Sequence, residues 1–340
     1  MKITSFMAAS ALAFAAALTG GMAQADDKIT IRLSNLWPEN HMYYQHGAKV
    51  FAEAVTEATG GKVVFENFHA SQLGKDQLSL LSSGLADFAI VGAPYSPDKL
   101  PLSGVVDLPG VATSTCDAVK RLWPMAQDGG LLDQHEYDNL GIRVLFVGAP
   151  PGLKVMTTKK EVTKLEDLNG LKLRALAGPQ SATARGLGAI PVQMQAGEVY
   201  ESLSRGTVDG AIYIWVGVPP FSLQELLHHT VEGITLGSAA VLYGIRQETW
   251  DKLPADVQQA MIAAGEEAQQ VLCDYQDTEE NKIRDSYVAA GTLKITEIPE
   301  EEADRWRAQI TSVASDWAKQ LDDSGRPGSA ILEAYTRTPE

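Results

Sequence analysis

Short apolar runs alternate with segments of helical spacing along most of this chain, and this alternation restricts its fold more than any other feature. Near the start, Ile29, Ile31 and Leu33 alternate with polar residues, as in a half-buried strand. Residues 48–58 then place apolar side chains three and four apart, and the glycine pair 60–61 ends that pattern. Strands that alternate with helices build βαβ units around a sheet. The sequence therefore predicts an α/β architecture.

The same order of strands and helices continues through the middle of the chain. Further strands are expected at residues 62–68, 87–91, 141–147, 171–175, 190–194 and 208–212, and further helices at 76–83 and 197–204. No long linker or low-complexity segment separates the two halves. Any crossing between lobes must therefore be short.

Two ten-residue segments resemble each other: residues 81–90 have the sequence LSSGLADFAI and residues 203–212 the sequence LSRGTVDGAI. Each predicts a helix that ends at a glycine, followed by an aspartate and a buried strand. A shared βαβ pattern could produce such a match, but the repeat favours two lobes of similar design. Ligands of open α/β sheets lie beyond the carboxyl ends of the strands. Residues 91–95 and 213–215 are therefore expected to face one cleft from opposite sides.

The first 25 residues have the three parts of a secretory signal peptide. Lys2 supplies the positive charge, residues 6–18 form a short apolar run, and Ala-Gln-Ala at 23–25 is the cleavage site. The apolar run is too short to span a bilayer as a stable helix. Cleavage would leave 315 of the 340 residues, more than the ~100–200 residues of a single-core domain. We therefore expect an exported, two-lobed protein.

The chain is strongly acidic, with a formal net charge of −15. Binding to nucleic acid or to anionic lipid depends on basic patches, so neither is expected here. If the protein binds an anion, a few basic residues at the site must attract it, although the chain as a whole is negatively charged.

The sequence contains two cysteines, Cys116 and Cys273, and neither belongs to a C-x-x-C motif. In an oxidising compartment they could form one disulfide. Two separately buried thiols are an equal alternative, and the sequence leaves both open.

The C-terminal third is helical in pattern. Residues 255–290 predict a very long helix, with a break possible inside it, that could extend beyond one lobe. Residues 306–321 predict one further amphipathic helix, closed by the turn at 322–325.

Motifs of catalysis are absent. The six histidines form no H-E-x-x-H motif and no pair four residues apart, and the chain has no phosphate-binding loop, dinucleotide-binding motif or G-x-S-x-G elbow. We predict no catalytic residue, no metal site and no cofactor, and therefore a protein that is not an enzyme.

Residues suited to binding lie near the predicted strand ends. The guanidinium of Arg174 could hold a carboxylate or sulfonate with two hydrogen bonds, or it could pair with a glutamate on the surface. Tyr213 and Trp215 could offer a hydroxyl and an apolar wall, or belong to the core. Loop residues that follow a strand often reach ligand. The candidates of this kind are Asn35 and Trp37 after the first strand and Tyr95 after a later one. Tyr43 and Tyr44 also follow the first strand.

At this point the chain resembles a known family, the solute-binding proteins of TRAP transporters (tripartite ATP-independent periplasmic importers) of the DctP type. The resemblance rests on the motifs SQLG at 71–74, DLNGLKLR at 167–174, GAIPV at 188–192, EVY at 198–200 and VDG at 208–210. Each motif alone is weak, but their order and spacing along nearly the whole mature chain are typical of the family.

The resemblance implies a two-lobed periplasmic-binding-protein fold with a long helix spanning both lobes. It also implies a monomer that delivers its ligand to a permease driven by an ion gradient. The expected division is a signal peptide at 1–25, lobe I at 26–150, lobe II at 151–236, a return to lobe I at 237–276 that includes the start of the long helix, and lobe II with the C-terminal helices at 277–340. Arg174 falls on the family's arginine, which binds the ligand carboxylate.

Departures from the family pattern concern the ligand. Tyr213 takes the place of an asparagine that touches ligand in many relatives, and Trp215 adds bulk. A second family arginine aligns with Lys154, or with no residue if the gap lies elsewhere. Glycine and proline fill much of 91–94, where relatives can be polar. The family pattern with these changes predicts a monoanion, a carboxylate or sulfonate, with a partly apolar or aromatic body.

The expected function is therefore capture of a small organic acid between two lobes and its delivery to a TRAP permease. The long helix and the short crossings near Pro150-Pro151 and Gly237 are expected to act as the hinge. Two alternatives belong to other classes: a binding protein of an ATP-driven importer or a sensor kinase, and a periplasmic enzyme.

Overall fold

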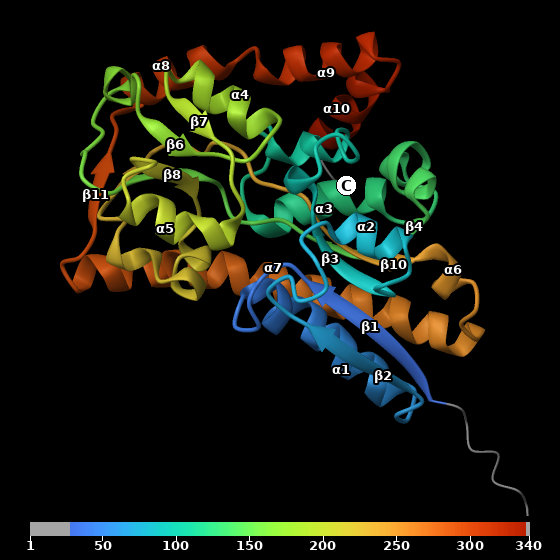
Figure 1. Cartoon of the computed structure of the whole chain (residues 1–340). Coiled ribbons are helices and arrows are strands. Elements are labelled where there is room, and N and C mark those ends of the chain that lie inside the picture. The colour runs from blue at the N-terminus through green and yellow to red at the C-terminus, as the bar shows by residue number, and fades with distance from the viewer. Residues whose placement is uncertain (1–27, 338–340) are drawn as a thin grey trace, which may run out of the picture.

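The computed structural model describes residues 28–337, and the expected signal peptide lies outside them. Within this range the strands form two sheets, each the centre of one lobe, and one long helix runs beneath both (Figure 1). We call the lobe with the five-stranded sheet the first lobe and the lobe with the six-stranded sheet the second lobe. The predicted α/β, two-lobed architecture is confirmed.

The first lobe is built on the strand order β2-β1-β3-β10-β4. Its strands are β1 (Ile29–Asn35), β2 (Val63–Phe68), β3 (Phe88–Gly92), β4 (Ile142–Gly148) and β10 (Val241–Arg246). β1 pairs in parallel with β2 and β3, and β10 lies antiparallel between β3 and β4. The sequence did not predict β10, which returns to this sheet after the chain has built most of the other.

The second lobe has the order β11-β9-β5-β8-β6-β7. Its strands are β5 (Lys154–Thr157), β6 (Lys172–Arg174), β7 (Ile190–Val192), β8 (Gly210–Tyr213), β9 (His229–Glu232) and β11 (Lys294–Glu297). β6 pairs in parallel with β7 and β8, and β5 lies antiparallel between β8 and β9. Apart from β11 at the edge, this sheet repeats the pairing of the first.

The two similar sequence segments occupy equivalent places in the two sheets. Helices α2 (Gln77–Ser82) and α5 (Val199–Ser204) are each followed by a glycine with φ of +70°, and each then leads into a central strand. The aspartate after each glycine accepts a hydrogen bond from the backbone of the neighbouring strand. Asp87 binds Arg32 N at 3.0 Å, and Asp209 binds Lys172 N at 2.9 Å. The predicted similarity of the two lobes is confirmed.

The remaining helices cover the sheets and connect the lobes. They are α1 (Lys49–Ala58), α3 (Thr115–Ala126), α4 (Pro179–Gly186), α6 (Gln247–Trp250), α7 (Ala255–Ala289), α8 (Glu300–Ile310), α9 (Val313–Asp323) and α10 (Gly328–Thr336). The long helix α7 is continuous. It packs against α1, α3 and β4 in the first lobe and against residues 215–217 in the second. The predicted helix that spans both lobes is confirmed.

The single amphipathic helix expected at 306–321 is wrong. α8 ends at Ile310 and α9 begins at Val313, with a turn at residues 311 and 312. The buried residues Trp306, Ile310 and Val313 keep helical spacing across the turn, so periodicity could not reveal it. α8 and α9 run in line above α4, and α10 packs beside α3 in the first lobe (Figure 1).

Two short segments cross between the sheets, one after β4 and one after β9. They lie side by side, since Leu153 N donates to Gly237 O at 2.9 Å and Leu236 N to Leu153 O at 2.9 Å. The hydroxyl of Ser238 donates to Pro150 O at 2.6 Å. At Gly237 the φ of +96° and the close approach of Asp107 O require a residue without a side chain.

Cys116 and Cys273 form a disulfide, which decides between the two alternatives left open by the sequence. The bond joins the first turn of α3 to the middle of α7. Among residues 28–337 no helix is both long enough and apolar enough to cross a membrane.

Candidate functional site

A cavity lies between the lobes, at the carboxyl ends of β1, β3, β6 and β8, where the sequence placed the cleft. The centre of a water-sized sphere can reach about 60 Å³ inside it, so it has room for one small compact molecule. Its lining comes from both lobes and from the crossing segments. The lining residues are Trp37, His41, Met42, Tyr43, Gly92, Pro94, Tyr95, Pro150, Leu153, Arg174, Leu176, Gln180, Ala196, Tyr213, Ile214, Gly217, Ala239, Ala240 and Val241.

Arg174 is the cation of this cavity. It is the last residue of β6 and only 3% exposed. Its Nη2 donates to the hydroxyl of Tyr95 at 3.2 Å, and its guanidinium carbon lies 5.3 Å from the centre of the Tyr213 ring. Its Nε is buried without a hydrogen-bond partner, and none of the described carboxylates pairs with it. The guanidinium is therefore buried without a counter-ion, which is costly unless an anion joins it.

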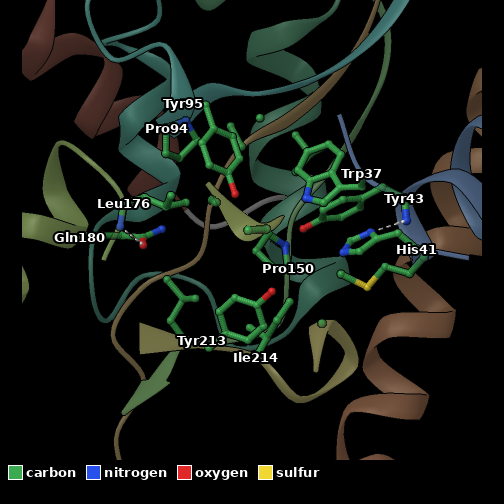
Figure 2. A pocket seen from close by; sticks show the side chains of 18 of the residues that line it. Trp37, His41, Tyr43, Pro94, Tyr95, Pro150, Leu176, Gln180, Tyr213 and Ile214 are labelled. Atoms are coloured by element: carbon green, nitrogen blue, oxygen red, sulfur yellow. Dashed lines mark hydrogen bonds between the residues drawn. The ribbon is translucent and has the colours of Figure 1, made fainter. Parts of the chain in front are cut away.

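Aromatic rings form much of the wall. The ring of Trp37 packs edge-on against Tyr43, with centroids 4.7 Å apart, and against Tyr95 at 6.2 Å. Gly92 makes this packing possible, because a Cβ there would lie 2.8 Å from the Tyr95 ring. Figure 2 shows Tyr95 and Tyr213 on opposite sides of the cavity, with their hydroxyls turned towards its interior.

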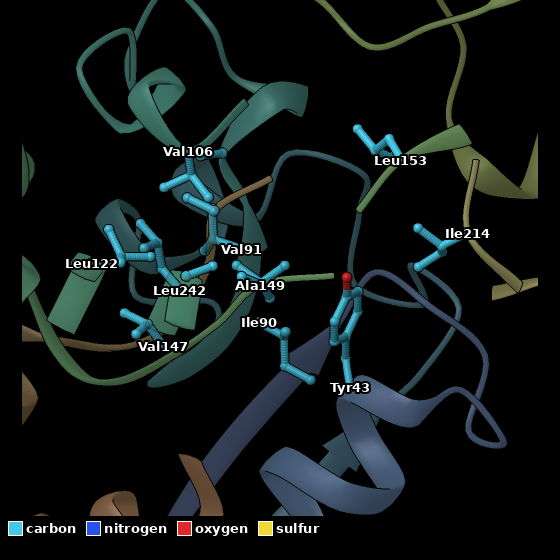
Figure 3. Packing of buried hydrophobic residues seen from close by; sticks show 14 of the residues in the cluster. Tyr43, Ile90, Val91, Val106, Leu122, Val147, Ala149, Leu153, Ile214 and Leu242 are labelled. Carbon is cyan, nitrogen blue, oxygen red and sulfur yellow. The ribbon is translucent and has the colours of Figure 1, made fainter. Parts of the chain in front are cut away.

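The apolar floor of the cavity is continuous with the core of the first lobe. Tyr43, Leu153 and Ile214 belong to a buried cluster that continues through Ala149 to Val147 in β4 of the first sheet (Figure 3). Packing of this kind holds the two lobes and the crossing segment together at the base of the cleft.

Charge in the lining is restricted to Arg174. Among residues 28–337 no aspartate or glutamate lines the cavity, and burial raises the pKa of the Tyr213 hydroxyl, which stays neutral. The side-chain amide of Gln180 is already hydrogen-bonded within the protein. Its Nε2 donates to Asp107 at 3.0 Å and to Ser238 O at 3.2 Å, and its Oε1 accepts from Leu176 N at 3.2 Å. Burial raises the pKa of Asp107 well above its usual range. The site thus offers one positive charge and several neutral hydrogen-bonding groups.

Of the seven residues that the sequence proposed for binding, four line the cavity: Trp37, Tyr95, Arg174 and Tyr213. The other three lie beside it. Asn35 accepts a hydrogen bond from Trp37 N at 3.0 Å and contacts His69 Nδ1 at 3.3 Å, so it shapes the loop after β1.

Lys154 and Trp215 do not line the cavity, because the side chains of both contact residues of α7. The ammonium of Lys154 lies 3.2 Å from Glu280 and 3.0 Å from Gly152 O. The indole of Trp215 is fully buried and packs edge-on against Tyr287. Glu280 also accepts hydrogen bonds from the backbone N of Trp215 at 3.0 Å and of Val216 at 2.9 Å. This carboxylate neutralises Lys154 and fixes the segment that follows β8.

His41, Leu176, Gln180 and residues 239–241 were missed as lining residues. His41 lies after β1, between Trp37 and Tyr43, and that position could have indicated it. Tyr43, which the sequence also indicated in this segment, lines the cavity, and Tyr44 does not. Residues 239–241 reach the cavity only because the chain crosses back into the first sheet as β10. The family resemblance implied a return of the chain to the first lobe at residue 237, but it did not indicate that residues 239–241 line the cavity.

Among the described residues, one cluster of possible metal ligands occurs: Cys116, Cys273 and Asp274. Both sulfurs belong to the disulfide, so neither is available as a thiolate ligand.

Comparisons with known proteins agree with this geometry. Residues 33–320 match the family model of the bacterial extracellular solute-binding proteins, family 7. The C4-dicarboxylate-binding periplasmic protein DctP of Rhodobacter capsulatus is 27% identical over 85% of this chain and 86% of its own length. The 2,3-diketo-L-gulonate-binding periplasmic protein YiaO of Escherichia coli is 27% identical over 75% of this chain and 77% of its own.

Solved structures share the fold. A TRAP solute-binding protein from Rhodoferax ferrireducens, in complex with copurified benzoate, has a TM-score of 0.83 and 23% identity, covering 91% of this chain and 97% of that one. A TRAP periplasmic solute-binding protein from Bordetella bronchiseptica, with bound (R)- and (S)-mandelate, has a TM-score of 0.82 and 22% identity, covering 91% and 98%.

Proposed function

The chain belongs to family 7 of the bacterial extracellular solute-binding proteins, the solute receptors of TRAP transporters, and we propose that its ligand is a small aromatic monocarboxylate held by Arg174. The family consists of receptors, so the function is binding outside the cytoplasm and delivery to a TRAP permease rather than catalysis. We also propose that the chain passes from one lobe to the other between residues 150 and 151, between 236 and 237, and between 276 and 277.

The observation that carries the proposal is the unpaired guanidinium of Arg174. A carboxylate that enters the cavity can meet two N–H groups of the planar fork, including the unpartnered Nε. The hydroxyl of Tyr95, which comes from the other lobe, already contacts the same guanidinium. A bound carboxylate would thus join both lobes through one charged group. The low dielectric of the closed cleft strengthens that contact.

The number of charges argues for a monoanion. Lys154 is neutralised by Glu280, so Arg174 alone can balance a ligand's charge. A second carboxylate, as in a C4-dicarboxylate, would be buried without a partner. The ammonium group of an amino acid would likewise find no acidic residue in the lining.

The aromatic residues in the cavity wall favour a ligand that contains an aromatic ring. Trp37, Tyr43, Tyr95 and Tyr213 surround a compact space with flat faces and edges, which suits a ring stacked or set edge-on. Benzoate and mandelate in the two solved relatives are acids of this kind, and they support the proposal.

Capture is proposed to proceed by closure of the lobes around the ligand. The paired crossing segments, held by the contacts of Leu153 with residues 236 and 237, provide the hinge. At the mouth of the cleft, Lys75 of the first lobe pairs with Glu198 of the second at 3.0 Å. Such a pair forms only when the lobes meet, and the closed form is the one expected to dock on the permease.

The proposal is tested by calorimetric titration of the mature protein with benzoate, mandelate, succinate, galacturonate and alanine. Benzoate or mandelate is expected to bind most tightly. Arg174→Ala is expected to weaken binding by on the order of 3 kcal/mol, because it strands a buried carboxylate. This corresponds to about a hundredfold higher Kd.

Arg205→Ala is the matched control, since Arg205 lies in the same lobe but is exposed and pairs with Glu201. It is expected to leave the Kd unchanged. An unchanged Kd in Arg174→Ala, or tighter binding of succinate, galacturonate or alanine than of both aromatic acids, contradicts the proposal.

A further inference from the structure

His41 lines the cavity, but no part of the proposed carboxylate site uses it. Its imidazole is 2% exposed and stacks on Trp37, with centroids 5.5 Å apart and planes at 21°. On its other side it approaches Phe221 of the second lobe, with centroids 5.8 Å apart. The ring is therefore held between the two lobes, and its orientation is fixed by packing.

The hydrogen bond of one ring nitrogen determines what the other can do. Nδ1 lies 3.3 Å from the backbone N of Tyr43, which can only donate. Nδ1 must therefore accept, and in a neutral imidazole the proton then sits on Nε2. Burial lowers the pKa of His41 to about 3, so the ring is neutral near pH 7. Nε2–H hydrogen-bonds to none of the residues that the structure describes.

The position of His41 separates it from the carboxylate anchor. Arg174 contacts Tyr95 and Tyr213, whereas His41 contacts Trp37, Tyr43 and Phe221. Figure 2 shows His41 and Tyr43 on one side of the cavity, away from Tyr95 and Tyr213, with the unbonded ring nitrogen on the side that faces the cavity. The site thus places a charged donor at one place and a neutral donor at another.

We propose that Nε2–H of His41 is a second anchor, which donates to an oxygen on the ligand ring and so selects aromatic acids that carry a hydroxyl or carbonyl oxygen. This inference rests on the proposed function, because it needs the carboxylate to sit on Arg174. A ligand without that oxygen would leave the buried N–H unpaired, and a site built to bind a hydroxyl rejects the analogue that lacks it.

The experiment compares benzoate, 3- and 4-hydroxybenzoate, and the 3- and 4-methylbenzoates of matched size. Wild-type protein is expected to bind the better hydroxybenzoate at least tenfold more tightly than benzoate and than its methyl counterpart. His41→Asn keeps an oxygen that can accept from Tyr43 N but loses the donor at the Nε2 position. It is expected to bring the ratio of the Kd values for the hydroxy and methyl acids close to one.

His41→Gln is the matched control, since its amide N can reach the place of Nε2 and is expected to keep part of the preference. Equal binding of the hydroxy and methyl acids by wild-type protein overturns the inference without any variant. So does a preference that His41→Asn leaves intact, or an equal loss of affinity for all acids, which would mean that His41 only packs. If wild-type protein binds none of these acids, the result contradicts both the proposed aromatic ligand and the inference about His41. Binding of them all without preference removes the inference alone.

Discussion

At the scale of single residues, burial decides the charge of several side chains, and Glu136 is the clearest case outside the cavity. Its carboxyl group is 4% exposed and accepts hydrogen bonds from Leu102 N at 2.6 Å, from Ser103 N at 3.0 Å and from the Ser103 hydroxyl. Burial nevertheless raises its pKa from 4.5 to about 7. The free energy needed to desolvate the anion exceeds the stabilisation that these hydrogen bonds give it.

This shift predicts that Glu136 contributes less to the stability of the folded protein as the pH rises. Because the folded state binds the Glu136 proton more tightly than the unfolded state, the contribution of this group is complete below pH 4.5. It falls as the pH rises through 4.5 to about 7, by about 3 kcal/mol. Urea denaturation of wild-type protein and of Glu136→Gln between pH 5 and 8 measures it. The difference in unfolding free energy between the two proteins is expected to change over this range, and a pH-independent difference contradicts the prediction.

At the scale of elements, α7 is the part that joins the lobes. Its 35 residues extend about 52 Å. Its buried positions recur every three or four residues from Val257 to Glu280, and the rest of the helix is more exposed. Gly265 lets the helix approach β4, since a Cβ there would lie 2.7 Å from Leu145 O. Glu280, the last buried residue of the helix, and Tyr287 further along both contact the segment that follows β8 in the second lobe.

Removal of Glu280 is therefore expected to destabilise the protein strongly. Glu280→Ala leaves the Lys154 ammonium buried without a counter-ion and two backbone N–H groups without an acceptor. The expected loss of unfolding free energy is about 3–5 kcal/mol, measured by urea denaturation. The Kd for benzoate is also expected to rise, because the loosened segment follows Tyr213 and Ile214 of the cavity wall.

The control for this prediction is the double variant Lys154→Met with Glu280→Gln. It removes both charges and keeps an amide oxygen that can accept from the backbone of residue 215 or 216. It is expected to recover much of the lost stability, because no charge is left unpaired. A double variant as unstable as Glu280→Ala would mean that the ion pair is not the source of the effect.

At the scale of the whole molecule, contacts between distant segments fix the arrangement of the parts. The disulfide Cys116–Cys273 closes a sequence separation of 157 residues. Beside it, Asp277 of α7 accepts hydrogen bonds from Thr115 N at 2.7 Å and Cys116 N at 3.1 Å, the first turn of α3. Both connections hold α3 on the long helix within the first lobe. The lobes themselves are joined by the crossing segments and by α7.

Loss of the disulfide is expected to lower stability without changing ligand affinity. The variant Cys116→Ala with Cys273→Ala should lose about 2–5 kcal/mol and melt roughly 5 °C lower than wild type. Calorimetry measures the Tm, and reduction of the wild-type protein is expected to cause a similar decrease. The Kd for benzoate should not change, because neither cysteine lines the cavity. Equal Tm values for the variant and the oxidised wild type contradict this account.

The sequence by itself determined the features that depend on neighbouring residues. The alternation of strand and helix patterns, the glycine-aspartate turns of the two lobes and the long helix from Ala255 all follow from periodicity and turn chemistry, which act over a few residues. The place of Arg174 at the end of a strand was predictable for the same reason, since strand ends converge on the cleft. Its role as a ligand anchor is still a prediction.

Only the tertiary structure decided which side chains are free to bind. Lys154 and Arg174 are both basic residues of central strands. Lys154 is paired with Glu280, 126 positions away, whereas Arg174 has no counter-ion. The pairing of Cys116 with Cys273 likewise depends on residues far along the chain, since 157 positions separate them. A local pattern sets backbone conformation and burial, but the charge and hydrogen-bonding capacity left to a ligand depend on which partners the folded chain brings into contact.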